Sequence, residues 1–184
     1  MRKSMIHVSF DPVEAFVPRV PSQRIEGEME EDSVTKRICA SSTILGALRG
    51  IPSGGQVLYQ MQRLEIPLLI HAYYMEGKYI VPTEQQVPDR FVTDEVWFLR
   101  TPEKIRRVDY LVTDLELFPL DGVDKSLQFV LNASVKRCPY GDNKKNLCEL
   151  FQKKHPQNIE EFSFREIMLS AGNDLFLAKK ERGL

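Results

Sequence analysis

Three short stretches of the sequence combine residue types that can hold and polarise a small molecule. They are His7-Val8-Ser9, Arg37-Ile38-Cys39-Ala40-Ser41 and Thr93-Asp94-Glu95. Imidazole and hydroxyl groups position a bound substrate, and a fixed carboxylate stabilises positive charge that develops on a reacting carbon. The first and third stretches lie in predicted strands, and the second precedes a predicted helix. They are therefore candidates for a single site built from distant parts of the chain.

In this order the three stretches resemble the ADP-ribosyltransferase superfamily, most closely its poly(ADP-ribose) polymerase-like branch. In that family a first strand ends in His-Gly-Ser, and a second strand reads roughly Ile-Tyr-Phe-Ala before a helix that contains serine. A later strand begins Asn-Glu-Tyr. The resemblance covers about residues 5–115. It implies a protein that binds NAD as a substrate, or a related nucleotide, and transfers ADP-ribose to a macromolecular acceptor.

The resemblance also implies a role for individual residues. His7 and Ser9 match the residues that bind the adenosine ribose and the nicotinamide amide of NAD. Glu95 matches the catalytic glutamate, which stabilises the oxocarbenium-like state as nicotinamide leaves. Arg19 and Arg24 follow the first strand and could pair with the pyrophosphate, because guanidinium groups fit phosphate oxygens.

Two positions depart from the family pattern. The tyrosine on which nicotinamide stacks falls at Ile38, or at Cys39 after a shift of one residue, and Val8 replaces a glycine. Another tyrosine could supply the ring, the candidates being Tyr59, Tyr73 and Tyr74. The sequence therefore leaves open both a transferase and a non-catalytic module that binds a nucleotide or a protein. A regulatory or phage-type accessory protein without pocket chemistry is the third interpretation.

The same residues also have plain structural interpretations. His7 can be a hydrogen-bonded histidine of a half-buried strand, and Glu95 can be a solvated carboxylate at a strand start. Ser41 can bind the ligand, but either Ser41 or Ser42 can instead cap a helix over residues 43–49, because a short side-chain oxygen accepts from the first free amides.

Hydrophobic periodicity predicts an α+β fold. Strand patterns and helical patterns do not alternate regularly, so the expected sheet is antiparallel or mixed, with flanking helices. The resemblance implies the split sheet of the ADP-ribosyltransferase type. Strands are predicted over residues 6–10, 37–40, 64–75, 78–81, 95–99, 107–117 and 159–164, and helices over 43–49, 128–135, 146–154 and 175–182.

Proline and glycine near residue 120 predict a body of residues 1–120 and a helix-rich C-terminal lobe of residues 121–184, unless the two form one domain. In the body, Trp97 is expected in the core. The acidic stretch 26–32 is expected only to keep a surface loop soluble.

Bulk properties narrow the class of protein. The net charge is −1, without the basic excess typical of proteins that bind duplex nucleic acid, so such a partner is disfavoured. Three cysteines indicate reduced thiols and a cytoplasmic location. The spacing of Cys138, Cys148 and His155 matches no usual zinc motif, so no metal is expected. No apolar run is long enough to cross a membrane. The acceptor or protein partner is not specified by the sequence.

Overall fold

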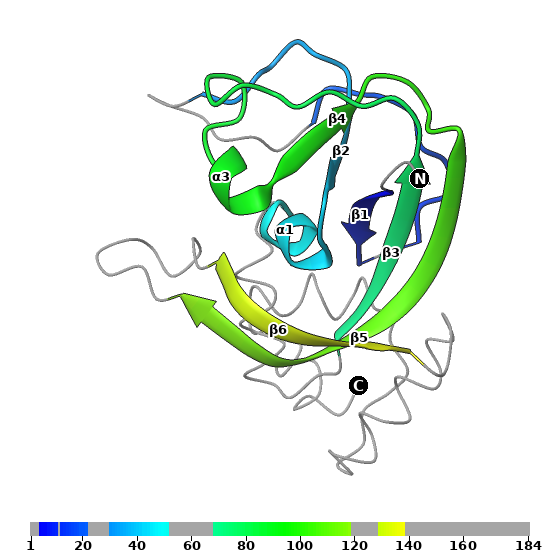
Figure 1. Ribbon diagram of the computed structural model, residues 1–184, viewed down its shortest axis with the longest axis vertical. Coiled ribbons are helices and arrows are strands. Elements are labelled where there is room, and N and C mark those ends of the chain that lie inside the picture. The colour runs from blue at the N-terminus through cyan, green and yellow to red at the C-terminus, as the bar shows by residue number, and fades with distance from the viewer. Residues whose placement is uncertain (1–3, 11, 22–29, 52–67, 119–128, 139–184) are drawn as a thin grey trace, which may run out of the picture. The chain divides into compact units, whose positions relative to one another are not determined.

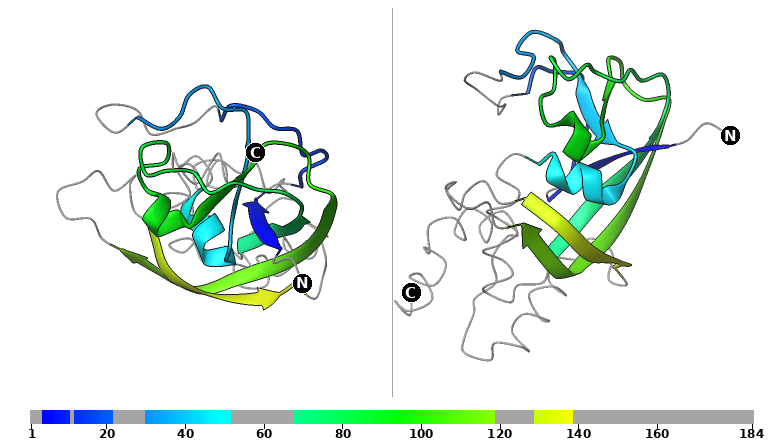
Figure 2. Two further views of the ribbon diagram at one scale, coloured as in Figure 1. Left: turned by 45° about the horizontal axis from the view of Figure 1, so that its top comes forward. Right: turned by 60° about the vertical axis from the view of Figure 1, so that its left-hand side comes forward.

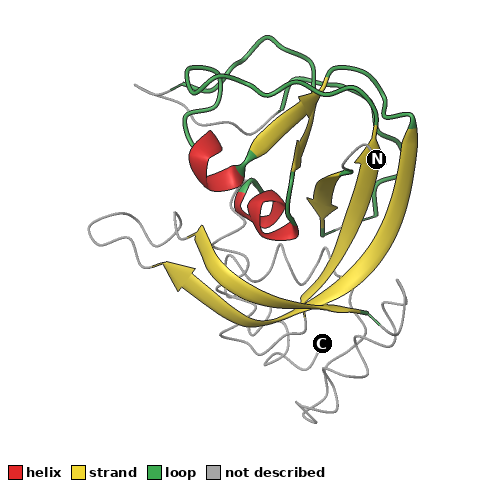
Figure 3. Cartoon of the chain, viewed as in Figure 1, coloured by secondary structure: helices red, strands yellow, loops and turns green. Residues whose placement is uncertain are grey.

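The structure is a computed structural model that describes residues 4–10, 12–21, 30–51, 68–118 and 129–138. Six strands form one sheet in the order β4-β2-β1-β3-β5-β6 (Figures 1 and 3). The described elements are β1 (Met5–Ser9), β2 (Ile38–Ser41), α1 (Ile44–Arg49), β3 (Leu68–Glu76), α3 (Arg90–Thr93), β4 (Glu95–Phe98), β5 (Lys104–Phe118) and β6 (Phe129–Arg137). A mainly antiparallel sheet with few helices confirms the predicted α+β class at this coarse level.

The chain divides into two compact units. The first comprises residues 1–54 and 71–108, and the second comprises residues 55–70 and 109–184. β1, β2 and β4 belong to the first unit together with most of β3 and the start of β5, whereas β6 and the rest of β5 belong to the second. This division differs from the predicted domains of 1–120 and 121–184.

Apolar and polar residues alternate in β1, whereas β2 and β4 are buried at most positions on both faces. β1 pairs antiparallel with β3 along its whole length, from Met5 opposite Met75 to Ser9 opposite His71. On its other side β1 pairs with β2, and β2 pairs with β4. The strands that carry the three sequence stretches are therefore adjacent, with β2 in the middle.

The pairing register determines which residues share a face of this sheet. Ile6 lies opposite Ser41, and Ser41 lies opposite Glu95. Directly opposed residues on antiparallel strands point to the same face, and successive residues of one strand point to opposite faces. Ile6, Ser41 and Glu95 therefore share one face, which we call the Glu95 face. His7, which lies opposite Tyr73, points to the other face, called here the His7 face.

The His7 face carries an apolar core that joins four strands. Val13 and Phe16, from the segment that follows β1, pack against this core. Burial of branched, aromatic and sulfur-containing side chains from neighbouring strands is the main favourable contribution to such a sheet. The buried members of the core are Met5, Ile38, Ala40, Tyr73, Met75, Val96 and Phe98.

Helix α1 packs on the Glu95 face, next to β1 and β2 (Figure 2). Its N-cap is Thr43, whose hydroxyl accepts the N–H of Gly46 at 2.9 Å. The predicted cap at Ser41 or Ser42 is therefore wrong by one or two residues, although Ser41 Oγ accepts the N–H of Thr43 at 3.3 Å. Gly50 ends the helix as predicted. None of the helices among the described residues is long and apolar enough to cross a membrane.

The structure differs from the sequence prediction at two further places. Residues 128–135 were predicted to form a helix, but they lie almost entirely in β6, which pairs antiparallel with β5. A short apolar run fits either element, and pairing with a neighbouring strand decides between them. The loop 83–94 contains the unpredicted helix α3, which ends at Asp94 in the left-handed conformation, with φ of 50°. The predicted elements beyond residue 138 lie outside the described residues.

Gly46 allows the close approach of α1 to the sheet, and this gives a stability prediction. A Cβ atom there would lie 2.3 Å from Ser41 Oγ and 2.5 Å from the carbonyl oxygen of Thr93. We expect Gly46→Ala to lower the free energy of unfolding, measured by urea denaturation, by about 1–3 kcal/mol. The control is Gly50→Ala, because a Cβ at Gly50 meets no atom closer than 3.7 Å. Equal stability of the two variants would contradict the prediction.

Candidate functional site

The residues predicted to form one site separate into two groups. Ser9 follows His7 by two positions and shares its face, whereas Ser41 and Glu95 lie on the Glu95 face. The structure therefore does not bring His7 and Glu95 together around one ligand. Arg19 is exposed, and its main chain pairs with that of Arg37.

Arg24, which was expected to bind phosphate, lies outside the described residues.

The imidazole of His7 is engaged inside the protein. Its Nδ1 donates to the carbonyl oxygen of Cys39 at 2.8 Å. The ring contacts Phe16 edge-on, with centroids 5.3 Å apart, and lies 6.3 Å from the ring of Tyr73. Burial lowers the pKa of His7, and the charge of Arg19 lowers it further, against the opposing effect of the bond to Cys39. This geometry is that of a neutral structural histidine that links β1 to β2 through a hydrogen bond.

Of the tyrosines considered as a replacement stacking ring, the two in the described part of the chain are both engaged in other contacts. The hydroxyl of Tyr73 accepts the N–H of Val13 at 2.7 Å, and its ring packs edge-on against Phe16. Tyr74 carries the guanidinium of Arg106 over its ring at 4.7 Å. Tyr59 lies outside the described residues.

Glu95 is held by the side chain two residues further along its own strand. Nε1 of Trp97 donates to Oε1 of Glu95 at 2.6 Å. Burial raises the pKa of Glu95, and the nearby carboxylates of Glu31 and Asp89 raise it too, whereas hydrogen bonds from Cys39 and Trp97 oppose the rise. Burial likewise raises the pKa of the Cys39 thiol, so this thiol is a poor nucleophile.

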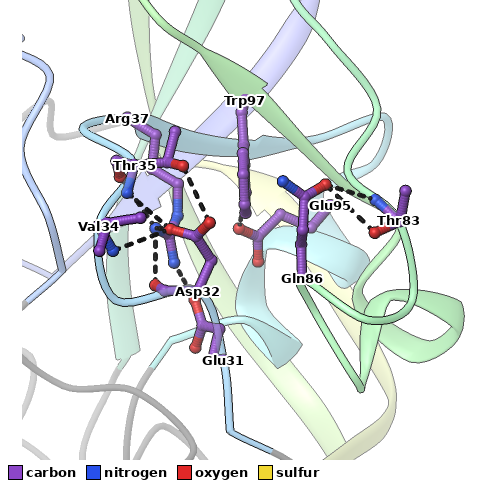
Figure 4. A network of polar contacts seen from close by, with 9 residues as sticks. All are labelled: Glu31, Asp32, Val34, Thr35, Arg37, Thr83, Gln86, Glu95 and Trp97. Carbon is purple, nitrogen blue, oxygen red and sulfur yellow. Dashed lines mark hydrogen bonds and ion pairs between the residues drawn. The ribbon is translucent and has the colours of Figure 1, made fainter.

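A buried arginine is the centre of the polar network on this face (Figure 4). The side chain of Arg37 is fully buried and lies over the indole of Trp97 at 4.3 Å. Its guanidinium forms ion pairs with Glu31 and with Asp32, the latter at 3.4 Å. It also donates to the carbonyl oxygens of Asp32 and Thr35, each at 3.0 Å. In Figure 4 the indole stands between this group and Glu95.

Asp32 also organises the turn that supplies these partners. Its Oδ1 accepts the N–H groups of Val34 at 3.1 Å and Thr35 at 2.7 Å, and its Oδ2 accepts the hydroxyl of Thr35. Although burial raises its pKa, these bonds and the charge of Arg37 lower it overall. The N–H of Asp32 donates to the carbonyl oxygen of Gln86 at 2.9 Å. The turn is thus connected both to β2 and to the loop before α3.

The acidic stretch 26–32 was expected only to keep a loop soluble, and for Glu31 and Asp32 this is wrong, since both neutralise Arg37. The signal was present in the sequence, because an arginine that opens a buried strand needs nearby carboxylates. Trp97 is in the core as predicted, with no exposed surface. Its stacking on Arg37 and its bond to Glu95 were not foreseen.

Where the chain is described, no three His, Cys, Asp or Glu side chains form a group that could hold a metal ion. Neither family models, nor curated proteins, nor solved structures give a match to the chain. Its function is therefore inferred from side-chain geometry.

The network around Arg37 gives a second stability prediction. Arg37→Met leaves the carboxylates of Glu31 and Asp32 without their cation, and their side chains are only 13% and 12% exposed. Because loss of one partner leaves buried charge uncompensated, we expect a loss of about 3 kcal/mol in the free energy of unfolding. The measurement is urea denaturation, with Arg19→Met as the control. Loss of a neighbouring but exposed cation should change stability by no more than about 0.5 kcal/mol.

Glu95 should affect stability in a pH-dependent way. Its folded-state pKa is raised above the ordinary value of 4.5, so ionisation weakens the folded state as the pH rises through and above that value. Glu95→Gln keeps an oxygen that accepts from Trp97 and removes the charge. We expect the variant to gain stability relative to the parent as the pH rises from about 4 to 7. Chemical denaturation at a series of pH values measures this difference, and a difference that is constant with pH would refute the raised pKa.

Proposed function

We propose that this chain is a non-catalytic binding module built on an ADP-ribosyltransferase-like sheet, and that its ligand is another macromolecule. Transfer of ADP-ribose requires groups that grip both ends of NAD on one side of the sheet. The residues assigned to those tasks by resemblance are His7 and Glu95. Their placement on opposite faces is the observation that carries the proposal.

The state of the carboxyl group supports the absence of turnover. Departure of nicotinamide leaves positive charge on the ribose carbon, and a preorganised negative charge is what stabilises it. In Glu95 burial works against ionisation, and one oxygen already accepts a bond from Trp97. A carboxyl group in this setting suits the packing of β4 on β2 better than electrostatic catalysis.

A second candidate is a module that binds NAD or a related nucleotide without cleaving it. The order of the strands favours this alternative, because the three strands with the resembling stretches lie side by side as β4-β2-β1. Ser41 lies opposite Glu95 in that arrangement. The two candidates differ in whether a nucleotide stabilises the folded chain.

The test combines two measurements on the purified full chain. Nicotinamide release from NAD is followed for the parent and for Glu95→Gln, and thermal unfolding is recorded with and without NAD or ADP-ribose. We expect no release above that of buffer from either protein, and no stabilisation by the nucleotides, because a ligand raises the melting temperature only if it binds the folded state.

The other outcomes each have a definite meaning. Release by the parent that Glu95→Gln abolishes would overturn the proposal in favour of a transferase. Stabilisation by NAD or ADP-ribose without release would support the nucleotide-binding candidate in its place.

A further inference from the structure

On the side of β4 that faces away from β2, the sheet of the first unit continues only as a single bridge residue, Ile80. β4 is the outermost strand on its side of the sheet, and Ile80 pairs with Trp97 along it in an antiparallel bridge. Both hydrogen bonds of this bridge, N–H of Ile80 to Trp97 and N–H of Trp97 to Ile80, measure 2.9 Å. Pro82 has no N–H to continue the ladder, so the inward pairing stops at Ile80.

The main-chain groups next to Ile80 point away from the sheet. In an antiparallel ladder a residue that bonds inward through both its N–H and its C=O has neighbours whose N–H and C=O point outward. For Tyr79 and Val81 no main-chain hydrogen bond is found within the described part of the chain. The segment Tyr79–Val81 therefore forms an open edge of the sheet, which we call the Ile80 edge.

The side chains of the Ile80 edge are apolar and exposed. Tyr79 is 37% exposed, Ile80 38% and Val81 52%. Native proteins usually protect an open edge with charges, bulges or covering segments, because its free groups are a template for another strand. Here three consecutive exposed apolar residues border the unused donors and acceptors. Figure 1 shows this stretch between β3 and α3 passing the outer end of β4.

We propose that the Ile80 edge pairs antiparallel with the same edge of a second copy of this chain. The outward groups of Tyr79 then bond those of Val81 in the second copy, and the reverse pair forms the symmetric contact. Ile80 lies on the two-fold axis opposite its own equivalent, as a symmetric interface requires. Within Tyr79–Val81 every direct pair in this register is apolar with apolar, which is the arrangement that stabilises cross-strand neighbours.

The residues beside the edge limit the length of the paired segment. Lys78 falls opposite Pro82 of the second copy, and the turn at residues 84–86, in which the N–H of Gln86 donates to the carbonyl oxygen of Thr83 at 3.0 Å, ends the extended segment beyond it. An extended peptide of another protein could use the same edge, but the self-complementary apolar pattern of Tyr79–Val81 favours a second copy.

The contact is small, which determines the affinity to expect. Four main-chain hydrogen bonds and three apolar side chains from each copy cover less surface than the ~1,200 Å² of a stable interface. We therefore expect reversible association that appears between about 10 µM and about 1 mM chain. Sedimentation velocity of the full chain over this range should show the weight-average mass rising from monomer towards dimer.

A charge exchange at the axis tests the register itself. Ile80→Lys and Ile80→Glu each place like charges opposite one another in the symmetric pair, so each variant alone should dissociate at least about tenfold more readily. An equimolar mixture of the two should recover the association, because unlike charges then meet. Phe91→Lys, which adds the same charge at a residue 82% exposed in α3, is the control and should leave the dimer intact.

A further variant separates loss of pairing from loss of folding. Val81→Pro removes an outward N–H and leaves both bonds between Ile80 and Trp97 available, so the chain should keep its melting temperature and lose its association. The proposal is overturned if the parent is monomeric over the whole range, or if the mixture of Ile80→Lys and Ile80→Glu associates no better than either alone. It is independent of the NAD experiments, whose outcome leaves this prediction unchanged.

Discussion

The strict alternation of side chains across β1, β2 and β4 is the constraint on which the rest of the first unit depends. Each strand is only four or five residues long, so its pairing leaves little freedom in which residues face which side. A shift of one residue in any of these pairs would exchange the two faces. The observed register puts an apolar core under His7 and a polar network beside Glu95, and the argument against turnover of NAD follows from that separation.

The Glu95 face tolerates its buried polar groups because most of them satisfy one another, although Nε of Arg37 has no hydrogen-bond partner among the described residues. Arg37 costs a large desolvation free energy, which two carboxylates, two carbonyl oxygens and the indole of Trp97 offset. The indole in turn donates to Glu95, so a single aromatic side chain links the arginine to the acid. A group that is already bonded in this way is well placed to fix a strand and poorly placed to meet a ligand.

The sequence was informative about the strands and much less so about the site. β1, β2 and β4 were predicted within one or two residues, because alternation and branched residues are local signals. The facing of His7 and Glu95 depends on pairing between segments far apart in the chain, which no local pattern encodes. β6 was mistaken for a helix for a related reason, since its partner β5 decides its conformation. The carboxylate and carbonyl partners of Arg37 lie within six residues of it in the sequence. They could have been inferred once Arg37 was assigned to a buried strand.

The side chains with the most versatile chemistry are His7, Arg37 and Glu95, and all three are bonded within the protein. Recognition of a partner therefore falls to main-chain groups and to exposed apolar side chains. An edge strand recognises a partner through donors and acceptors that every residue possesses, and the exposed side chains beside it select the register. Pro82 sets the limit of this edge by ending the ladder with β4, while Gly77, with φ of 154°, makes the turn that carries the chain there from β3. Two residues with special backbone properties thus create the open edge that we propose as the recognition element. A structural interior and an exposed edge fit the proposed binding module, because the interior side chains then need only to hold the edge in place.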